Sequence, residues 1–443
     1  MYLSAGRAAD AARGISAHDR GPRRAAVPGT VLALGMVSLV TDVSAEMVTA
    51  VLPLYLVAGL GMTPLAFGAL EGFHQGAGAL LRLVGGRVAD RTRRRKRVAG
   101  TGYALSAVCK ALLPVAATPW AVAGVLAADR AGKGLRTAPR DALISLSVPP
   151  AAQGRAFGVH RAMDTTGALL GPLAAFGVLW FVADGYDAVF TLSFCCAALG
   201  VVLLALFVRE APAPDLPEGP VAPGPGGRAD RVPVLRTLLG VPGLLRLCAA
   251  AAGLGVFTVG DAFLYLLLQR RLDLSAAQFP LLAVGTSAVF LLCAVPVGRL
   301  ADRVGRSRMF LAGHVLPAAV CLLLALPGPA GGGLLLLAVP VLLGVFYAAT
   351  DGVLMAAAGP LLPEPLRTTG LAAVQTAQAL GRFAGAVLFG AAWTAWGPGP
   401  ALVVAAAGLL AGTAGAAVLR GKSGRKRTIH SIRTTRTSRT TRT

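Results

Sequence analysis

One apolar segment, residues 120–146, carries charges that could hold an ionic substrate or relay protons: Asp129, Arg130, Lys133, Arg136, Arg140 and Asp141. If this segment spans a bilayer, each charge costs roughly 2.5–3.5 kcal/mol at the helix centre. The six must therefore pair internally, face water or lie near a helix end. Asp129, Lys133 and Arg136 share a helical face with Arg140, whereas Arg130 points about 100° away from Asp129.

Carboxylates recur in other apolar segments. Asp42 and Glu46 lie four residues apart on one helix face, where burial and like charge favour protonation of one carboxyl group, as a reversible proton carrier requires. Asp164 can pair with either His160 or Arg161 on its own helix, and His160 could titrate between about pH 5 and 8. A local ion-pair cluster that holds this helix against residues 120–146 is the alternative interpretation there. The cations of 120–146 could also be the partners of Asp42 and Glu46. We predict ten substrate or proton-coupling residues: Asp42, Glu46, Asp129, Arg130, Lys133, Arg136, His160, Arg161, Asp164 and Asp261, with Asp351 and Arg382 as further cavity candidates.

The elements that position these residues follow from composition. The chain is 55% hydrophobic and only 14% charged, against roughly 25% charged residues in a soluble domain. Its apolar residues form blocks of about twenty, the length that crosses a bilayer. About twelve such blocks occur, near 29–57, 65–86, 98–117, 119–143, 156–182, 187–208, 240–268, 276–298, 308–327, 331–358, 368–394 and 398–419. The sequence predicts an all-α polytopic membrane protein.

The formal net charge of +22 would indicate nucleic acid only if it were spread over a soluble surface. Instead, Lys and Arg concentrate in alternate connections, as the positive-inside rule describes. We therefore predict a cytoplasmic-membrane protein whose two termini are both cytoplasmic, with the basic surplus facing anionic lipids and no nucleic-acid partner. The six cysteines fall inside apolar blocks without metal-ligand spacing, so we expect no metal site and no cofactor.

A Pro/Gly-rich stretch, residues 211–227, lies near the middle of the chain and is typical of a linker. We predict a basic tail at 1–27, a six-helix bundle at 28–208, a cytoplasmic linker at 209–236, a second six-helix bundle at 237–419 and a basic tail at 420–443. Both tails are low in complexity, and we expect them to be disordered. Two such halves around a midplane site are a transporter architecture.

A short basic motif is repeated in the two halves: GRVADRTRRRKR begins at Gly86 and GRLADRVGRSRM begins at Gly298. Both copies resemble motif A of the major facilitator superfamily (MFS), which lies in the loops between helices 2 and 3 and between helices 8 and 9. The resemblance implies the MFS fold and a conformational latch at Gly86, Asp90, Arg91, Gly298, Asp302 and Arg303. The first copy departs from the motif at Val88 and Arg93. Charge that only sets topology is the alternative role.

Two further stretches resemble MFS motifs. Leu126, Arg130 and Gly134 match motif B, with Lys133 in place of its Gln; Gly167, Gly171 and Pro172 match part of motif C, which is associated with antiporters. We therefore predict a monomeric secondary transporter that exchanges protons for a small solute or drug, more in the direction of export. Uptake or exchange of an anionic metabolite, bound by the cations of 120–146, is the alternative. No ATP-binding loop and no nucleophile–base motif occurs, so we do not expect an enzyme.

Overall fold

The structure is a computed structural model that describes residues 28–73, 94–116, 118–149, 153–208, 240–326, 332–362 and 367–418. All regular elements within these ranges are helices, which confirms the predicted all-α class. Nine of the described helices are long and apolar enough to span a bilayer, as a multi-pass membrane protein requires. The helix over 119–146 is not among the nine because it carries too many charges. Residues 367–396 and the helix over 64–73 also fall outside them.

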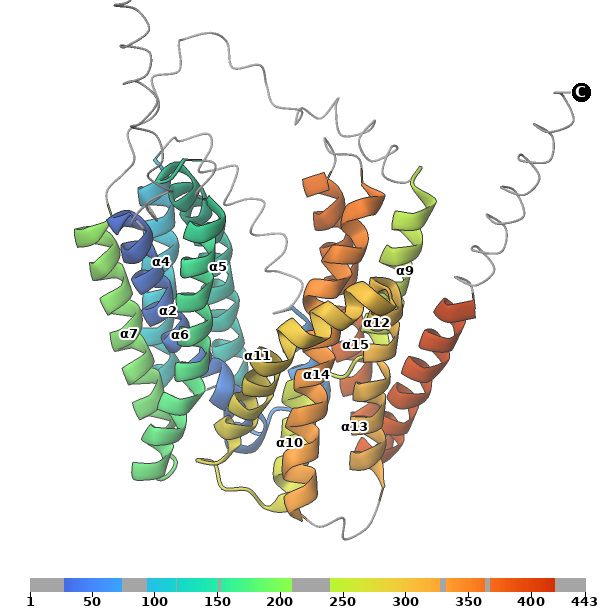
Figure 1. Ribbon diagram of the computed structural model, residues 1–443. Coiled ribbons are helices and arrows are strands. Elements are labelled where there is room, and N and C mark those ends of the chain that lie inside the picture. The colour runs from blue at the N-terminus through green and yellow to red at the C-terminus, as the bar shows by residue number, and fades with distance from the viewer. Residues whose placement is uncertain are drawn as a thin grey trace, which may run out of the picture.

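The first group of helices lies on the left of Figure 1 and contains α2 (Gly29–Leu54), α4 (Arg95–Leu112), α5 (Pro119–Leu146), α6 (Gln153–Phe181) and α7 (Tyr186–Phe207). α2 packs against both α6 and α7, while α4 packs against α5. Two glycines allow α6 to approach α2 closely. A Cβ atom at Gly167 would meet the backbone of Leu39, and one at Gly171 would lie 2.8 Å from the carbonyl oxygen of Val43. The predicted close helix contact at these glycines is therefore formed by α2 and α6.

The second group lies on the right of Figure 1 and contains α9 (Pro242–Phe257), α10 (Asp261–Leu272), α11 (Phe279–Val304), α12 (Arg306–Gly313), α13 (Val315–Ala325), α14 (Gly332–Ala358), α15 (Arg367–Trp396) and the helix Pro398–Val418. α11 packs along α14, and α15 packs along α9. Two groups of helices, one from each half of the chain, are the arrangement that the repeated motif predicts.

Two predicted helices are interrupted. The block 240–268 divides into α9 and α10, because Thr258, Val259 and Gly260 are not helical. Two β-branched residues followed by glycine form a helix poorly, which accounts for the position of the break. The block 308–327 likewise divides into α12 and α13 at His314.

We expected the second basic motif to lie in a loop. It lies instead in the last turns of α11, at Gly305 and in the first turn of α12. α11 continues to Val304, and Gly305 alone separates it from α12. Gly305 has φ 106°, a backbone conformation that residues other than glycine rarely adopt. A single glycine therefore makes the turn that the sequence assigned to a longer basic connection.

The two groups meet where residues 64–73 of the first lie against the second. A Cβ atom at Gly68 would meet the backbone of Ala386 on α15, so the helices touch there without side chains between them. Four rings continue this contact, and we call them the aromatic plug: Phe67, Phe263, Phe389 and Trp393. Ring centroids lie 5.1 Å apart for Phe67 and Phe263 and 5.0 Å apart for Phe263 and Phe389. The plug lies toward the end of α15 that finishes at Trp396.

Candidate functional site

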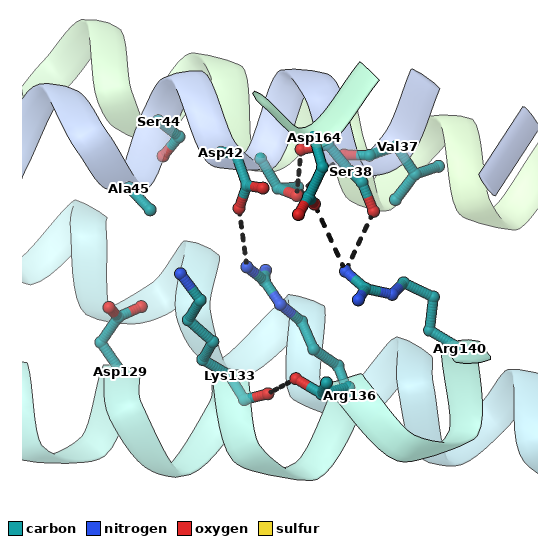
Figure 2. A network of polar contacts seen from close by, with 12 residues as sticks. Val37, Ser38, Asp42, Ser44, Ala45, Asp129, Lys133, Arg136, Arg140 and Asp164 are labelled. Atoms are coloured by element: carbon teal, nitrogen blue, oxygen red, sulfur yellow. Dashed lines mark hydrogen bonds and ion pairs between the residues drawn. The ribbon is translucent and has the colours of Figure 1, made fainter. Parts of the chain in front are cut away.

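Charged side chains of α2, α5 and α6 meet in a buried network inside the first group (Figure 2). Arg136 Nη2 lies 3.9 Å from Asp42 Oδ1. Arg140 Nη1 lies 3.7 Å from Asp164 Oδ1 and donates a hydrogen bond of 3.2 Å to Ser38 Oγ. These contacts link α5 to both α2 and α6, and they involve three of the predicted site residues, Asp42, Arg136 and Asp164.

Asp42 and Asp164 face each other within this network. Their carboxyl groups are close neighbours, and two neighbouring carboxyl groups can share a hydrogen bond only when one of them carries a proton. Lys133 extends from α5 toward Asp42 in Figure 2, although the ion pairs found within 4 Å among the described residues do not include it. The arrangement can hold one proton between α2 and α6, in the field of neighbouring cations.

His160 and Arg161 take different positions beside Asp164. His160 is buried, and its Nε2 lies 2.9 Å from Ser38 Oγ on α2. Arg161 is 78% exposed, and its Nη1 lies 3.3 Å from Asp164 Oδ2. Of the two neighbours that could pair with Asp164, Arg161 does so, whereas His160 ties α6 to α2.

Asp129 lies apart from this network and pairs with a residue that the sequence analysis did not select. Lys110 Nζ on α4 lies 2.7 Å from Asp129 Oδ1, and the two residues are only 3% and 5% exposed. The signal was present: Lys110 is an isolated cation in an apolar block, which is costly without a partner. Arg130 follows Asp129 but forms no ion pair within 4 Å in the described ranges, where its buried Nε also lacks a hydrogen-bond acceptor.

A cavity of about 350 Å³ lies between the two groups of helices. It is lined from the first group by α2, residues 64–73 and Pro172 of α6, and from the second by α10, α11, α14 and α15. The interrupted stretch Thr258, Val259 and Gly260 also lines it. Non-helical backbone at membrane depth is tolerated where it borders a cavity, and broken helices mark binding sites in transporter folds.

Besides tyrosines, the described lining of this cavity contains four acidic side chains and one basic side chain: Glu46, Glu71, Asp261, Asp351 and Arg382. Asp261 is the first residue of α10, and its Oδ1 accepts a hydrogen bond of 2.8 Å from the Tyr347 hydroxyl group. Glu71 and Tyr347 were not selected from the sequence, although Glu71 is an acid within an apolar block. Only the folded chain places them beside Asp261.

Asp42 and Glu46, expected to act as a pair on α2, face different surroundings. Asp42 is buried against Arg136 and Asp164, whereas Glu46 lines the cavity one turn further along the helix. The carboxyl group that approaches Asp42 comes from α6. Four-residue spacing placed the two acids on one face correctly, but that face borders two distinct environments.

The second basic motif forms contacts between α11, α12 and α14. Arg306 Nε lies 2.8 Å from Asp302 Oδ1, and Arg306 Nη1 donates a hydrogen bond of 2.9 Å to the carbonyl oxygen of Ala356. Arg303 is exposed, and Gly298 lies inside α11 with open space where a Cβ atom would extend. The first copy, with Gly86, Asp90 and Arg91, lies outside the described residues.

Within the ranges that the structure describes, no group of three His, Cys, Asp or Glu side chains could hold a metal ion. The candidate site therefore consists of the buried network and the cavity. Neither contains a paired nucleophile and base of the kind used in covalent catalysis.

Comparison with known proteins identifies the family. The sequence profile of the Major Facilitator Superfamily matches residues 34–386 and again 247–440. The chain belongs to the major facilitator superfamily. An uncharacterised MFS-type transporter of Methanocaldococcus jannaschii is 27% identical over 372 residues, which cover 82% of this chain and 88% of the relative. This MFS protein is accordingly a multi-pass membrane transporter and not an enzyme.

Solved structures agree on the fold. The nucleoside transporter NupG superposes with a TM-score of 0.72 at 14% identity, covering 88% of this chain and 99% of that one. A peptide transporter of the POT type superposes with a TM-score of 0.73 at 16% identity, covering 90% and 95%. At such identities these two MFS structures establish the architecture alone, and the substrate follows from this chain's own side chains.

Proposed function

We propose that this MFS protein is a proton-coupled antiporter that exports a small solute by alternating access. The observation that carries the proposal is the proximity of the Asp42 and Asp164 carboxyl groups, which lie within 4 Å of Arg136 and Arg140 respectively. A pair that holds one proton between α2 and α6 couples protonation to the packing of these helices. The solute would occupy the neighbouring cavity, which Glu46 of α2 and Pro172 of α6 both line.

The same helices connect the proton site to the cavity. Asp42 and Glu46 lie one turn apart on α2, and Asp164 lies two turns before Pro172 on α6. A shift of α2 against α6 on deprotonation would therefore change the cavity wall directly. The close glycine contact at Gly167 and Gly171 leaves the two helices free of intervening side chains at this depth.

The export direction rests on the resemblance of Gly167, Gly171 and Pro172 to the antiporter-associated motif C. Closure of one side does not by itself distinguish import from export, because alternating access passes through such a state in both. The aromatic plug lies toward the far ends of α2 and α15. The Lys/Arg asymmetry supports placing those ends outside the cell, with both termini in the cytoplasm. In this orientation the cavity would be sealed from the outside and ready to receive a cytoplasmic solute. We further propose a monomer in the cytoplasmic membrane, built from halves 28–208 and 237–419.

The alternative, uptake of an anionic metabolite held by α5, has less support. Arg136 and Arg140 already have the carboxylate partners Asp42 and Asp164. No residue of α5 is among the described residues that line the cavity. The cations of this helix are therefore better suited to tune the proton site than to hold a substrate.

Proteoliposomes that hold a pH-sensitive dye test the proposal. With a panel of cationic, neutral and anionic solutes, at least one solute should move protons in the direction opposite to its own. Asp42→Asn, which mimics a permanently protonated carboxyl group, should retain solute counterflow but lose accumulation driven by a pH gradient. Asp187→Asn, at an exposed position on α7, is the matched control and should behave as the parent. Gradient-driven accumulation that survives both Asp42→Asn and Asp164→Asn would refute this proton site.

A further inference from the structure

The cavity between the two halves has a strongly unequal charge lining. Among the described lining residues, carboxyl groups come from four elements, namely Glu46 of α2, Glu71 of residues 64–73, Asp261 of α10 and Asp351 of α14, together with one cation, Arg382 of α15. Glu71 takes part in another interaction, and Glu46, Asp261 and Asp351 outnumber Arg382 without it. Arg382 forms no ion pair within 4 Å with a described carboxylate. It therefore does not neutralise any one of these acids by direct contact.

Most of the remaining wall is aliphatic or aromatic, with the hydroxyl residues Thr49, Thr258, Thr286 and Ser287 between. Rings line the cavity from both halves: Phe67, Tyr265, Phe279, Phe290 and Tyr347. The face of an aromatic ring attracts a cation, and the attraction increases when both partners are removed from water. The hydroxyl groups of Tyr265 and Tyr347 are already engaged with Thr286 and Asp261, at 2.7 Å and 2.8 Å. This leaves the rings as contact surfaces rather than as hydrogen-bond donors.

Size and sign together restrict what fits. A volume of about 350 Å³ is near the lower end of the range for small-molecule sites, about 300–1,000 Å³. An anion would add a further negative group beside several carboxylates, and like charges in a low dielectric repel strongly. A monocation instead reduces the imbalance, and its apolar part can cover the aromatic wall.

We propose that the substrate of this cavity is an organic monocation: a protonated or quaternary ammonium group carried on an aromatic or branched apolar body. The ammonium group lies between Asp261 and Asp351, and the body contacts Phe279 and Phe290. The inference rests on the proposed function in one respect, namely that this cavity holds the transported solute. It adds the chemical class, which neither the family nor the fold specifies.

Arg382 defines the nearest competing class. A zwitterion would place its ammonium group near Asp261 and its carboxylate on Arg382, since both residues line the cavity. The two classes differ in their dependence on this arginine. A monocation is repelled by Arg382 and gains from its removal, whereas a zwitterion loses a charge-assisted hydrogen bond.

Equilibrium binding to the purified full-length protein in lipid nanodiscs separates these classes. The cationic probes are benzyltrimethylammonium, tetraphenylphosphonium and ethidium; neopentylbenzene and benzenesulfonate are the neutral and anionic counterparts of the first. At least one cation should bind saturably, and the two counterparts should bind at least tenfold more weakly than that cation. Failure of all three cations to bind, or equal binding of benzenesulfonate, overturns the proposal.

Substitutions assign the binding to this cavity. Asp261→Asn and Asp351→Asn should each weaken cation binding at least tenfold, while Arg382→Gln should leave it unchanged or strengthen it. Asp187→Asn on the exposed start of α7 should bind as the parent does, and thermal unfolding checks that each variant is folded. Binding that survives Asp261→Asn and Asp351→Asn places the cation elsewhere. A tenfold loss in Arg382→Gln indicates a zwitterion instead.

The outcome is independent of proton coupling, because binding in nanodiscs needs no gradient. If a cation binds but a pH gradient moves no solute in proteoliposomes, the substrate class stands and the proposed antiport fails. If a pH gradient drives only an anion or a neutral solute, the antiport stands and the cation proposal fails.

Discussion

The buried network and the cavity contain the same kinds of side chain but use them differently. In the first group of helices, Asp42, Asp129 and Asp164 each have a cationic nitrogen within 4 Å. In the cavity, Asp261 and Asp351 face open space, and Arg382 contacts neither closely. Buried charges that have a partner of opposite sign within the protein hold helices together. Charges directed at a cavity remain available to ions and solutes.

The backbone shows the same difference. The network joins α2, α5 and α6, which remain helical at the contact residues. The cavity borders the break between α9 and α10, where residues Thr258–Gly260 are not helical. Thr258 still donates from its N–H and its hydroxyl group to the carbonyl oxygen of Leu254, and the cavity leaves room for water or a ligand at the other freed groups. It accordingly occurs beside the cavity and not beside the ion pairs.

The largest expected effect concerns the most completely buried ion pair. In the parent, Lys110 Nζ lies 2.7 Å from Asp129 Oδ1. Lys110→Ala leaves this carboxylate buried without its cation. Breaking a buried pair in this way costs about 3–5 kcal/mol. We expect little folded protein after detergent extraction, measured by fluorescence-detected size-exclusion chromatography of a fusion protein.

The control for this variant removes both charges. Lys110→Met combined with Asp129→Leu has no unpaired ion, and apolar replacement of a buried pair is often neutral or stabilising. The double variant should recover most of the folded protein and retain transport. A double variant that folds but does not transport would assign Asp129 to function and not to packing.

The second prediction concerns the aromatic plug, which separates the cavity from the far end of the helices. Phe263 is 1% exposed and contacts Phe67, Phe389 and Trp393. Phe263→Ala should cost about 3 kcal/mol of packing, and the lost contact with Phe67 is the part that lies between the two groups. Amide hydrogen exchange should then accelerate at least tenfold in residues 64–73 and in the last turns of α15.

Phe190 provides a matched comparison, because it is also buried but contacts Tyr55 within the first group alone. Phe190→Ala should accelerate exchange around α2 and α7 and leave residues 64–73 as in the parent. If both variants accelerate hydrogen exchange equally in residues 64–73, the effect is a general loss of stability and not a local opening at the aromatic plug.

Sequence periodicity predicted the architecture well because membrane spans depend on length and hydropathy, which are local properties. It also identified Asp42, Asp164 and Arg136, since ions in apolar segments are conspicuous. It predicted partners only in part: the cations of 120–146 were expected near Asp42, and Arg136 lies there. Asp42 was expected to act with Glu46 on its own helix, and the carboxyl group it meets belongs to Asp164 on α6. Contacts between helices depend on rotation and depth, which one helix's spacing does not fix.

The cavity was harder to predict for a related reason. Glu71 lies near the start of an ordinary apolar block, and its importance arises only because residues 64–73 cross to the second group. The break before Asp261 was not predicted either, because Thr-Val-Gly weakens a helix without forbidding it. Glu71 and the break before Asp261 share one sequence signal, an acid within an apolar block. An isolated cation in such a block is the equivalent signal for Lys110.

The third prediction concerns the proton site and has an intermediate effect. Lys133 extends toward Asp42, and its positive charge opposes the uptake of a proton by that carboxyl group. Lys133→Gln removes this repulsion, so protonation should occur at a lower proton concentration. The midpoint of the pH profile of transport should move upward by about one pH unit, measured as initial rates in proteoliposomes. Arg303→Gln on exposed α11 should leave the midpoint unchanged, and a downward shift would contradict the assignment.

The smallest effect is expected at the second basic motif. Asp302 and Arg306 form one ion pair there, but within the described ranges only Arg306 is also bonded to another helix. Asp302 and Arg306 are 60% and 41% exposed, and an exposed pair four residues apart contributes about 0.3–0.5 kcal/mol. Asp302→Asn should therefore change thermal stability and transport less than twofold. Arg306 also donates to the carbonyl oxygen of Ala356 on α14, so Arg306→Ala removes a contact between helices and should slow transport more than Asp302→Asn. Proteoliposome rates at matched protein levels measure the difference. If Asp302→Asn is the more damaging of the two, the carboxylate has a partner in another conformation, as a latch across the halves would require.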